Sequence, residues 1–342
     1  MSFPQRSARV LVSVAAATLL LAACAPPQPE PTDAAPSESS SPVAAAPSFR
    51  LGLTCADLFD VATVQAQLSE PVTVKTDETS VLSEWDDVNF AQQGGLHCAW
   101  GGATGTDQFS DVGYELWIRP DAQADFDTWL ASGQATLDAQ CFESGFPCHQ
   151  AYTFEGNWVR TYMSDSGVSV DDAAITYAAL NNVIDEKIAG LPLADPWPAP
   201  ASGGDLCAEP AATERASQAL QRDQETLVGP QFPPDLSITT TGGTAITCGY
   251  YDYETFAQYL TVRQVQGGGW AFAAMATEAP EPFLIEPMVA TPIEGADVAY
   301  IGCGDGCAAL LKIGDDLVQL NTGEYFDREG FLPVVTAWVA GI

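Results

Sequence analysis

Basic residues are scarce in this sequence. Twelve lysines and arginines stand against 45 aspartates and glutamates, which gives a formal net charge of −33 at pH 7. A surface of that sign repels phosphate backbones and anionic lipid headgroups. The imbalance argues against nucleic acid as a partner and against electrostatic docking to a membrane. Most strongly acidic surfaces serve solubility, and a basic partner or weak cation binding is the alternative.

Motifs of the common catalytic sites are also missing. The chain has no Gly-x-Ser-x-Gly or Ser-x-x-Lys motif, and the glycine-rich run 101–106 lacks the lysine of a phosphate-binding loop. The two histidines, His97 and His149, each adjoin a cysteine, so backbone geometry explains them better than acid–base catalysis does. We therefore expect a protein that is not an enzyme and needs no cofactor. The alternative is a cell-envelope hydrolase with an unrecognised site.

The apolar run near the N-terminus is too short to span a bilayer. It extends from Val10 to Ala23, about 14 residues, whereas a spanning helix needs about 20. Arg6 and Arg9 precede it, and it ends in Leu-Ala-Ala-Cys at Cys24, the sequence at which bacterial lipoprotein processing cuts and lipidates the cysteine. We expect residues 1–24 to be a lipoprotein signal peptide, with diacylglycerol and palmitate on Cys24 at the extracytoplasmic side of the cell membrane. An uncleaved anchor with a coincidental cysteine is the alternative.

Residues 25–50 have the composition of a tether. Proline, alanine and serine occupy 18 of the 26 positions, without any apolar periodicity. Such a segment cannot bury enough surface to offset the entropy lost on ordering. We expect a disordered spacer that holds the folded part away from the lipid.

The eight remaining cysteines form two sets with the same order of gaps, namely Cys55, Cys98, Cys141 and Cys148, then Cys207, Cys248, Cys303 and Cys307. Other positions match in register with them. Leu96–Trp100 resembles Ile246–Tyr250 around a cysteine, and the closing residues 188–191 resemble 339–342. We therefore expect two tandem copies of one domain, at 51–193 and 205–342, joined by a Pro-rich linker at 194–204.

The cysteine spacing indicates disulfide bonds. Cys303 and Cys307 flank a Gly-Asp-Gly turn between two strand-like runs, which predicts a clasped hairpin, and Cys141 with Cys148 occupies the matching place. Pairs Cys55–Cys98 and Cys207–Cys248 then remain, although four cysteines allow three pairings and spacing alone does not decide between them. A zinc site is the alternative; an even count in each copy and the lack of histidine in the second copy oppose it. We expect no metal.

Within each copy the pattern predicts an α+β domain, an antiparallel sheet with helices packed on it. Expected elements are opening helices at 56–69 and 210–222, a helix at 121–134, and strands at 114–119 and 259–263. A terminal helix should start near 330–333 because Pro333 restricts it. In the first copy, the equivalent buried stripe should be Ile175, Ala179, Val183, Ile184 and Ile188.

Candidate binding residues are few. Trp85, in an acidic loop, and Trp197, among the linker prolines, are the candidate surface aromatics, whereas Trp117, Trp129, Trp158 and Trp338 fall on patterns typical of a core. Asp121, Asp125 and Asp127 resemble part of a calcium loop, but its glycine and closing glutamate are missing. We expect a binding, sensing or structural protein whose partner is an envelope protein, a polymer or a small ligand.

The signature at Cys24, the tether, a cysteine opening a helix, Cys98-Ala99-Trp100 and a clasped hairpin before a terminal helix together resemble uncharacterised lipoproteins of actinobacterial cell envelopes. Some of these are similar to the extracellular sensor domains of mycobacterial receptor kinases. The resemblance covers most of residues 51–342 and departs in the second copy, where Tyr250 replaces the tryptophan. It implies an extracytoplasmic α+β domain with a PsbP-like fold and carries over no catalytic residues.

Overall fold

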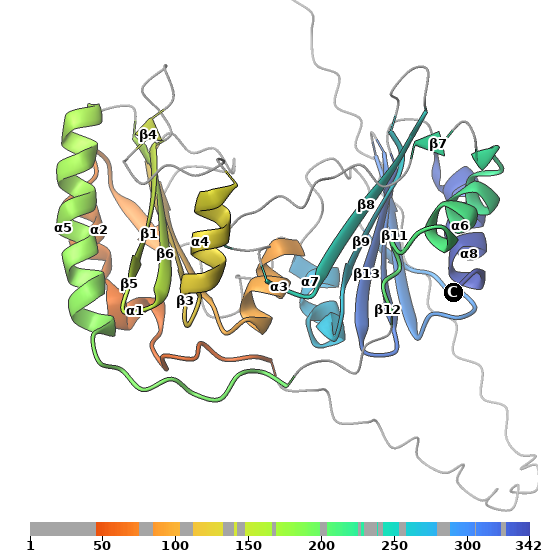
Figure 1. The fold of residues 1–342 in the computed structure, drawn as a ribbon. Helices are drawn as coiled ribbons and strands as arrows, with labels where there is room; N and C mark the ends of the chain where they lie inside the picture. The colour runs from red at the N-terminus through yellow and green to blue at the C-terminus, as the bar shows by residue number, and fades with distance from the viewer. Residues whose placement is uncertain are drawn as a thin grey trace, which may run out of the picture. The chain divides into compact units, whose positions relative to one another are not determined.

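The computed structural model contains two antiparallel β-sheets with helices packed on them, so the chain is an α+β protein (Figure 1). Residues Val43–Ile342 form one compact unit. The structure describes residues 46–74, 85–102, 112–132, 140–141, 148–165, 169–198, 204–224, 227–228, 238, 242–252, 258–278, 288–304, 306–322 and 326–342. We call residues 51–193 the first half and residues 205–342 the second half. Within these described ranges, no helix combines the length and the apolar character needed to cross a membrane.

The sheet of the first half has six strands in the order β1-β2-β3-β6-β5-β4. Strand β3 shows why the chain forms a half-buried strand here: alternate residues from Val112 to Ile118 are buried, as the expected alternation predicts. The strands are β1 (Val72–Val74), β2 (Leu96–Gly102), β3 (Val112–Arg119), β4 (Gln140–Cys141), β5 (Cys148–Phe154) and β6 (Asn157–Asp165).

The expected single helix at 56–69 is wrong. The chain instead forms two short helices, α1 (Cys55–Leu58) and α2 (Val61–Gln65), with an extended residue, Phe59, between them. Each has its own N-cap, because the side chain of Thr54 accepts a hydrogen bond from the amide of Asp57, and that of Asp60 accepts one from the amide of Thr63. A second capping residue six positions after the first restarts the helix.

Helix α5 (Val170–Ile188) covers one face of the first sheet, but through a different stripe from the expected one. Ile175 is 68 % exposed and Ala179 is exposed too, so the predicted burial of these two residues is wrong. The buried positions are Ala173, Thr176, Tyr177, Leu180, Ile184 and Ile188. Tyr177 sets which side of α5 faces the sheet. Its hydroxyl donates to the main-chain carbonyl of Cys148 at 2.6 Å, and its ring packs in the core. The opposite face of the sheet carries helix α4 (Gln123–Ala131).

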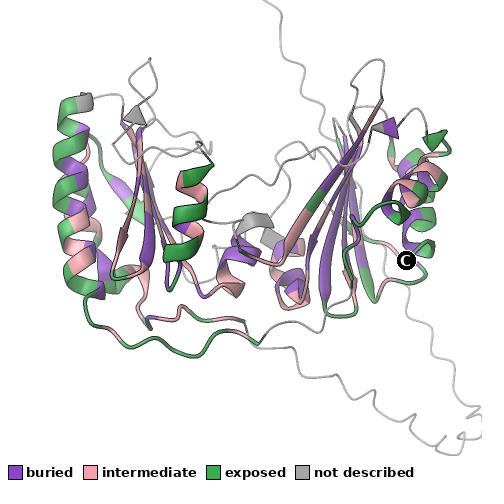
Figure 2. Ribbon diagram, in the orientation of Figure 1, coloured by how far each residue is buried: buried purple, intermediate pink, exposed green. Residues whose placement is uncertain are grey.

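The sheet of the second half has seven strands in the order β10-β11-β12-β13-β9-β8-β7. Its central strands are buried on both faces (Figure 2). The 3₁₀ turn η3 (Gly268–Ala271) and helix α7 (Phe272–Glu278) follow β9. The strands are β7 (Leu227–Val228), β8 (Ala245–Asp252), β9 (Gln258–Val265), β10 (Val289–Ala290), β11 (Val298–Cys303), β12 (Cys307–Ile313) and β13 (Asp316–Thr322).

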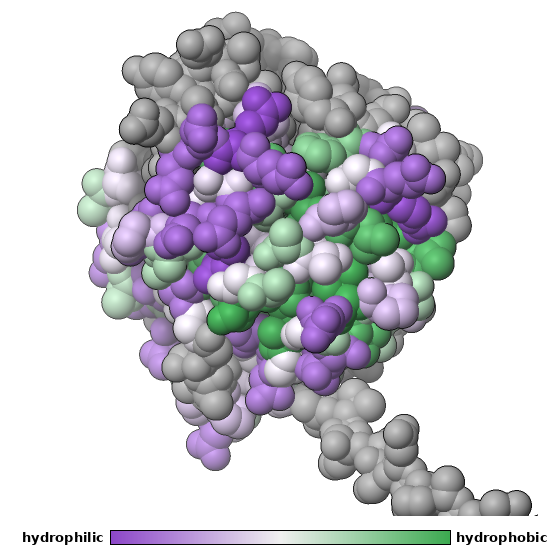
Figure 3. Space-filling model, turned by 90° about the vertical axis from the view of Figure 1, so that its right-hand side faces the viewer, coloured by the Kyte–Doolittle hydropathy of each residue, from purple (hydrophilic) through white to green (hydrophobic). Residues whose placement is uncertain are grey.

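Helices α6 (Ala211–Leu220) and α8 (Arg328–Ala340) cover one face of the second sheet. Trp338 and Phe331 of α8 are fully buried there. Figure 3 views this side of the molecule, where apolar residues gather among polar ones. Leu220 and Leu332 are partly buried against the core of this half, and Ile342 is 52 % exposed.

The expected start of the terminal helix near residues 330–333 is wrong, because α8 begins at Arg328. Asp327 caps it by accepting a hydrogen bond from the amide of Gly330 at 2.8 Å. Pro333 therefore lies inside the helix, where it removes the amide that would bond to the carbonyl of Glu329. Glu329 is exposed, so water can take the place of that bond.

Candidate functional site

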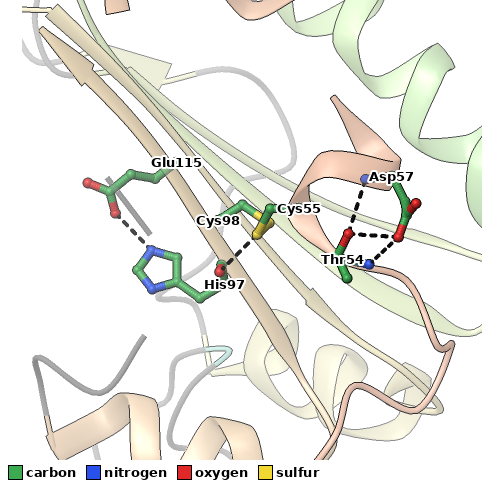
Figure 4. The surroundings of a disulfide bond; sticks show 6 residues. All are labelled: Thr54, Cys55, Asp57, His97, Cys98 and Glu115. Carbon is green, nitrogen blue, oxygen red and sulfur yellow. Dashed lines mark hydrogen bonds and ion pairs between the residues drawn. A yellow bond between two sulfur atoms is a disulfide. The ribbon is translucent and has the colours of Figure 1, made fainter. Parts of the chain in front are cut away.

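Among the described residues, three disulfide bonds are formed, and each joins a pair expected from the spacing: Cys55–Cys98, Cys207–Cys248 and Cys303–Cys307. The first ties the start of α1 to the middle of β2 (Figure 4). The last clasps the hairpin of β11 and β12, where the two cysteines face each other in register. Because Cys98, Cys248 and Cys307 are fully buried, these bonds belong to the two cores.

Cys148 is disulfide-bonded as well. The register of β4 and β5 places Cys141 directly opposite it, as the hairpin prediction requires. Cys148 and the buried hydroxyl of Tyr177 meet at the same point, since Tyr177 donates to the carbonyl of Cys148. This end of β5 is thereby held to α5.

His97 occupies the position on β2 next to the disulfide, with its side chain on the opposite face of the sheet from the Cys98 core. Its ring stacks on that of Trp117 of β3, with centroids 4.5 Å apart and planes 12° apart. Register explains the contact, because His97 and Trp117 are direct cross-strand partners. The guanidinium of Arg160, the next partner across the sheet on β6, lies 5.2 Å from the centre of the Trp117 ring.

Two carboxylates hold the His97 imidazole from its two nitrogens. Nε2 lies 3.3 Å from Glu115 of β3, within hydrogen-bond distance (Figure 4). Nδ1 lies 3.3 Å from Asp87 of helix α3 (Trp85–Gln92), at an ion-pair distance but without hydrogen-bond alignment. Burial lowers the pKa of His97, but the two carboxylates outweigh burial and raise the pKa from 6.5 to about 9. His97 is therefore a buried cation at neutral pH.

A set of polar and aromatic side chains surrounds His97 on this face of the first sheet. We call it the polar face: Glu115, Trp117, His149, Arg160 and Tyr162. The register brings them together, because Glu115 lies opposite Tyr162, which in turn lies opposite His149, while Trp117 lies opposite Arg160. All five are partly exposed.

Burial and nearby charges shift the pKa values of two side chains on the polar face, Tyr162 and His149. Burial and the nearby Glu115 carboxylate raise the pKa of Tyr162, which keeps its hydroxyl protonated as a donor. Burial and the Arg160 charge lower the pKa of His149, which therefore stays neutral and offers both a donor and an acceptor. The polar face thus presents a carboxylate, a guanidinium, a phenol and a neutral imidazole within neighbouring cross-strand positions.

The arrangement suits binding better than proton transfer. A general base must be able to take up a proton at the working pH, and His97 already holds one between two carboxylates. A set of fixed donors and acceptors can instead recognise a polar partner by hydrogen bonds.

Sequence reasoning attributed His97 and His149 to backbone geometry and so missed the polar face. The signal was present: His97 in β2 and Glu115 and Trp117 in β3 alternate with the core positions and are polar or aromatic. Asp87 could not have been connected to His97 from the sequence, because that contact needs α3 to fold back onto β2.

The two candidate surface aromatics lie elsewhere. Trp85 was expected in an acidic loop, but that is wrong, because it is the first residue of helix α3; its side chain lies outside the described residues. Trp197 is partly exposed in the segment after α5. That segment is held near the N-terminal residues, because the Ala194 amide donates to the Arg50 carbonyl and Arg50 Nε donates to the Ala194 carbonyl. Cys24 lies outside the described residues.

The tryptophans expected in cores fall into two groups. Trp158 and Trp338 are fully buried, as predicted, whereas Trp117 and Trp129 are only partly buried. Trp117 belongs to the polar face, and Trp129 packs on Trp158 with ring centroids 5.1 Å apart.

The aspartates that resemble a calcium loop are engaged in protein contacts. Asp125 forms an ion pair with Arg119, and Asp121 lies 3.9 Å from Arg50. In the part of the chain that the structure describes, no group of three or more histidines, cysteines or acidic residues is arranged to hold a metal ion.

The candidate site thus consists of His97, held between the carboxylates of Asp87 and Glu115, and the polar face around it. The sheet that carries His97 and the polar face is braced by disulfide bonds. Comparison of the chain with protein-family models, with curated proteins and with solved structures finds no match.

Proposed function

We propose that the protein is a lipoprotein anchored through Cys24 on the extracytoplasmic side of the cell membrane, where it acts as a non-catalytic binding module. Its recognition surface is the polar face of the first half. The partner is a component of the cell envelope, a polymer or a protein, that offers polar groups to that face. Nucleic acid is not a partner, because the chain carries a net charge of −33.

The disulfide bonds support the extracytoplasmic location. Buried structural disulfides form and persist in oxidising compartments outside the cytoplasm. Three such bonds fall within the described residues, and Cys148 takes part in a further one. The expected signal peptide at residues 1–24 supports the same compartment independently.

We propose further that the two halves are tandem copies of one domain. Starting from the opposite edge, the second sheet has the order β7-β8-β9-β13-β12-β11, which corresponds strand by strand to β1-β2-β3-β6-β5-β4 of the first. In both halves a long disulfide joins the opening segment to the second strand of that order. A terminal helix, α5 or α8, packs on the same sheet face as that disulfide. Each copy would have the PsbP-like arrangement that the resemblance implies.

The observation that carries the binding function is the polar face itself. The faces of both sheets toward α5 and α8 are apolar and buried, whereas these five side chains are polar or aromatic and partly exposed. Holding them on strands of a disulfide-braced sheet fixes their relative positions before a partner arrives, which lowers the entropy cost of binding.

Site-specific cross-linking in host cells tests this function. With p-benzoylphenylalanine in place of Tyr162, irradiation is expected to yield one defined adduct with an envelope component. The matched control is Ile175→p-benzoylphenylalanine. Ile175 is 68 % exposed and lies on α5, away from the polar face, so the same group there is expected to give no such adduct.

A second change keeps this test specific. Glu115→Gln is added to the variant that carries p-benzoylphenylalanine at position 162. It removes a charge from the polar face without adding bulk, so the yield of the cross-linked adduct is expected to fall severalfold. If positions 162 and 175 give the same adducts, or none, the polar face is not the recognition surface.

A further inference from the structure

Helix α3 of the first half packs into the second half. Val88 is fully buried, and it belongs to an apolar cluster whose other members all come from the second half: Val265, Ala271, Phe272, Met275, Leu310 and Leu317. Its neighbour in sequence, Asp87, pairs with His97 of the first sheet. Consecutive residues of one helix thus contact both halves.

Polar contacts fix the same helix to the second half. The side-chain oxygen of Asn89 accepts hydrogen bonds from the amides of Thr244 at 2.9 Å and Ala245 at 3.1 Å. The Thr244 hydroxyl lies 3.0 Å from the side-chain oxygen of Gln92, to which it donates. Asn89 is fully buried, so these amides would lose their partner without it.

The second half reaches into the first in return. Ile238, which precedes β8, is fully buried in a cluster whose other members come from the first half: Phe90, Ala122, Phe126, Ala151 and Trp158. Its carbonyl accepts a hydrogen bond from Arg119 of β3 at 3.4 Å. The contact is therefore reciprocal.

Two glycines allow this close approach. A Cβ at Gly243 would clash with the side-chain oxygen of Asn89, and one at Gly242 would clash with the Asp125 carboxylate. Gly242 also has φ +71°, a conformation that favours glycine. The segment before β8 is thus shaped to lie against the first half.

We propose that the two halves associate through a pseudo-two-fold interface, so that the partner each half is built to bind is a second copy of the same α+β unit. The contributing segments have equivalent places, since α3 lies between β1 and β2, and Ile238 with residues 242–244 lies between β7 and β8. The receiving clusters are equivalent too. One contains Phe126 of α4, after β3, and the other contains Phe272 of α7, after β9.

Use of the same patch on both sides is the mark of a two-fold interface. Only this equivalence depends on the proposed duplication, and the contacts themselves do not. The interface and the polar face share one residue, because Trp117 also packs against the cluster that contains Ile238. The three disulfide bonds that the structure describes each lie within one half, so none of these three holds the halves together.

Cleavage between the halves tests the interface. In the full chain carrying Cys24→Ala, which prevents lipidation, a specific protease site is inserted between Pro200 and Ala201 and cut after oxidative folding. The two fragments are expected to remain together as a 1:1 complex in native mass spectrometry and gel filtration at about 1 µM. Separation of folded fragments at that concentration would overturn the proposal.

Two variants test whether the contacts of Asn89 hold the halves together. Asn89→Ala is expected to weaken the cleaved complex by about tenfold or more, because it leaves the partly buried amides of Thr244 and Ala245 without this acceptor. Asn182→Ala, at an exposed position of α5, is the matched control and should leave the affinity unchanged. Equal affinities for the two variants, with circular dichroism showing both folded, would also overturn the assignment.

Discussion

Replacing Cys55 and Cys98 together by alanine is expected to lower the unfolding free energy of the first half by about 4 kcal/mol. The same double change at Cys303 and Cys307 should cost the second half only about 2 kcal/mol. The difference follows from loop length, because the first bond closes a separation of 43 residues and the second a separation of 4. A longer loop restricts the unfolded chain more when it is closed.

Hydrogen exchange measures both effects in one molecule. The slowest amides of β3 report on the first half, and those of β12 report on the second, so each variant has an internal control. We expect β3 to lose protection in the Cys55→Ala, Cys98→Ala variant while β12 changes little. A larger loss from the hairpin variant than from the long-loop variant would show that chain entropy does not explain these bonds.

Raising the pH from 6.5 to about 9 is expected to remove about 3 kcal/mol of stability through His97. Burial acts against the charged ring, but Asp87 and Glu115 outweigh it, so the pKa in the folded protein lies near 9 against 6.5 for an unconstrained histidine. Below pH 6.5 both the folded and the unfolded chain hold the proton, and the full contribution is present. It declines as the pH rises and is gone once the folded protein has also lost the proton, above about 9.

Few other groups interfere in this window. Cys55, Cys98, Cys148, Cys207, Cys248, Cys303 and Cys307 are disulfide-bonded and do not ionise, and the buried tyrosines have raised pKa values. His149 has a lowered pKa, so its effect lies on the acid side of 6.5. The alkaline slope therefore belongs to His97 and its two carboxylates.

Urea unfolding at a series of pH values isolates this effect. The wild type should lose stability between pH 6.5 and 9, whereas His97→Gln should be flat there because it has no proton to lose. His149→Gln is the matched control and should keep the wild-type slope. If the wild type and His97→Gln run parallel across the window, the ion-locked histidine does not contribute as described.

Local features of the fold could be predicted from the sequence. The alternation in β3 and the cysteine pair around Gly304 to Gly306 are each decided within a few residues, and the structure has the strand and the clasped hairpin. Helices α4 and α6 lie where the periodicity indicated helices, although both are shorter than expected.

Choices that depend on tertiary packing could not be predicted. Helix α5 carries apolar side chains on more than one face, and only the sheet beneath it selects Tyr177 over Ile175 for burial. The start of α8 was misplaced because the cap at Asp327 outweighs the local effect of Pro333.

The candidate site shows the same limit. Cross-strand neighbours such as His97 and Trp117 are 20 positions apart and meet only through the register of β2 and β3. Asp87 and Asn89 act from opposite sides of one short helix, and the sequence does not indicate which half each will contact. The polar face and the interface between the halves therefore required the structure.

The central claim is that a lipid-anchored, extracytoplasmic protein is built from two units, each closed by its own disulfide bonds. Mass spectrometry of non-reduced peptides from protein extracted from host membranes tests it most directly. We predict a diacylglycerol-modified N-terminal Cys24 together with linked peptides for Cys55–Cys98, Cys141–Cys148, Cys207–Cys248 and Cys303–Cys307. An unmodified Cys24 with free thiols at the other positions, or a linked peptide that joins the two halves, would contradict the claim.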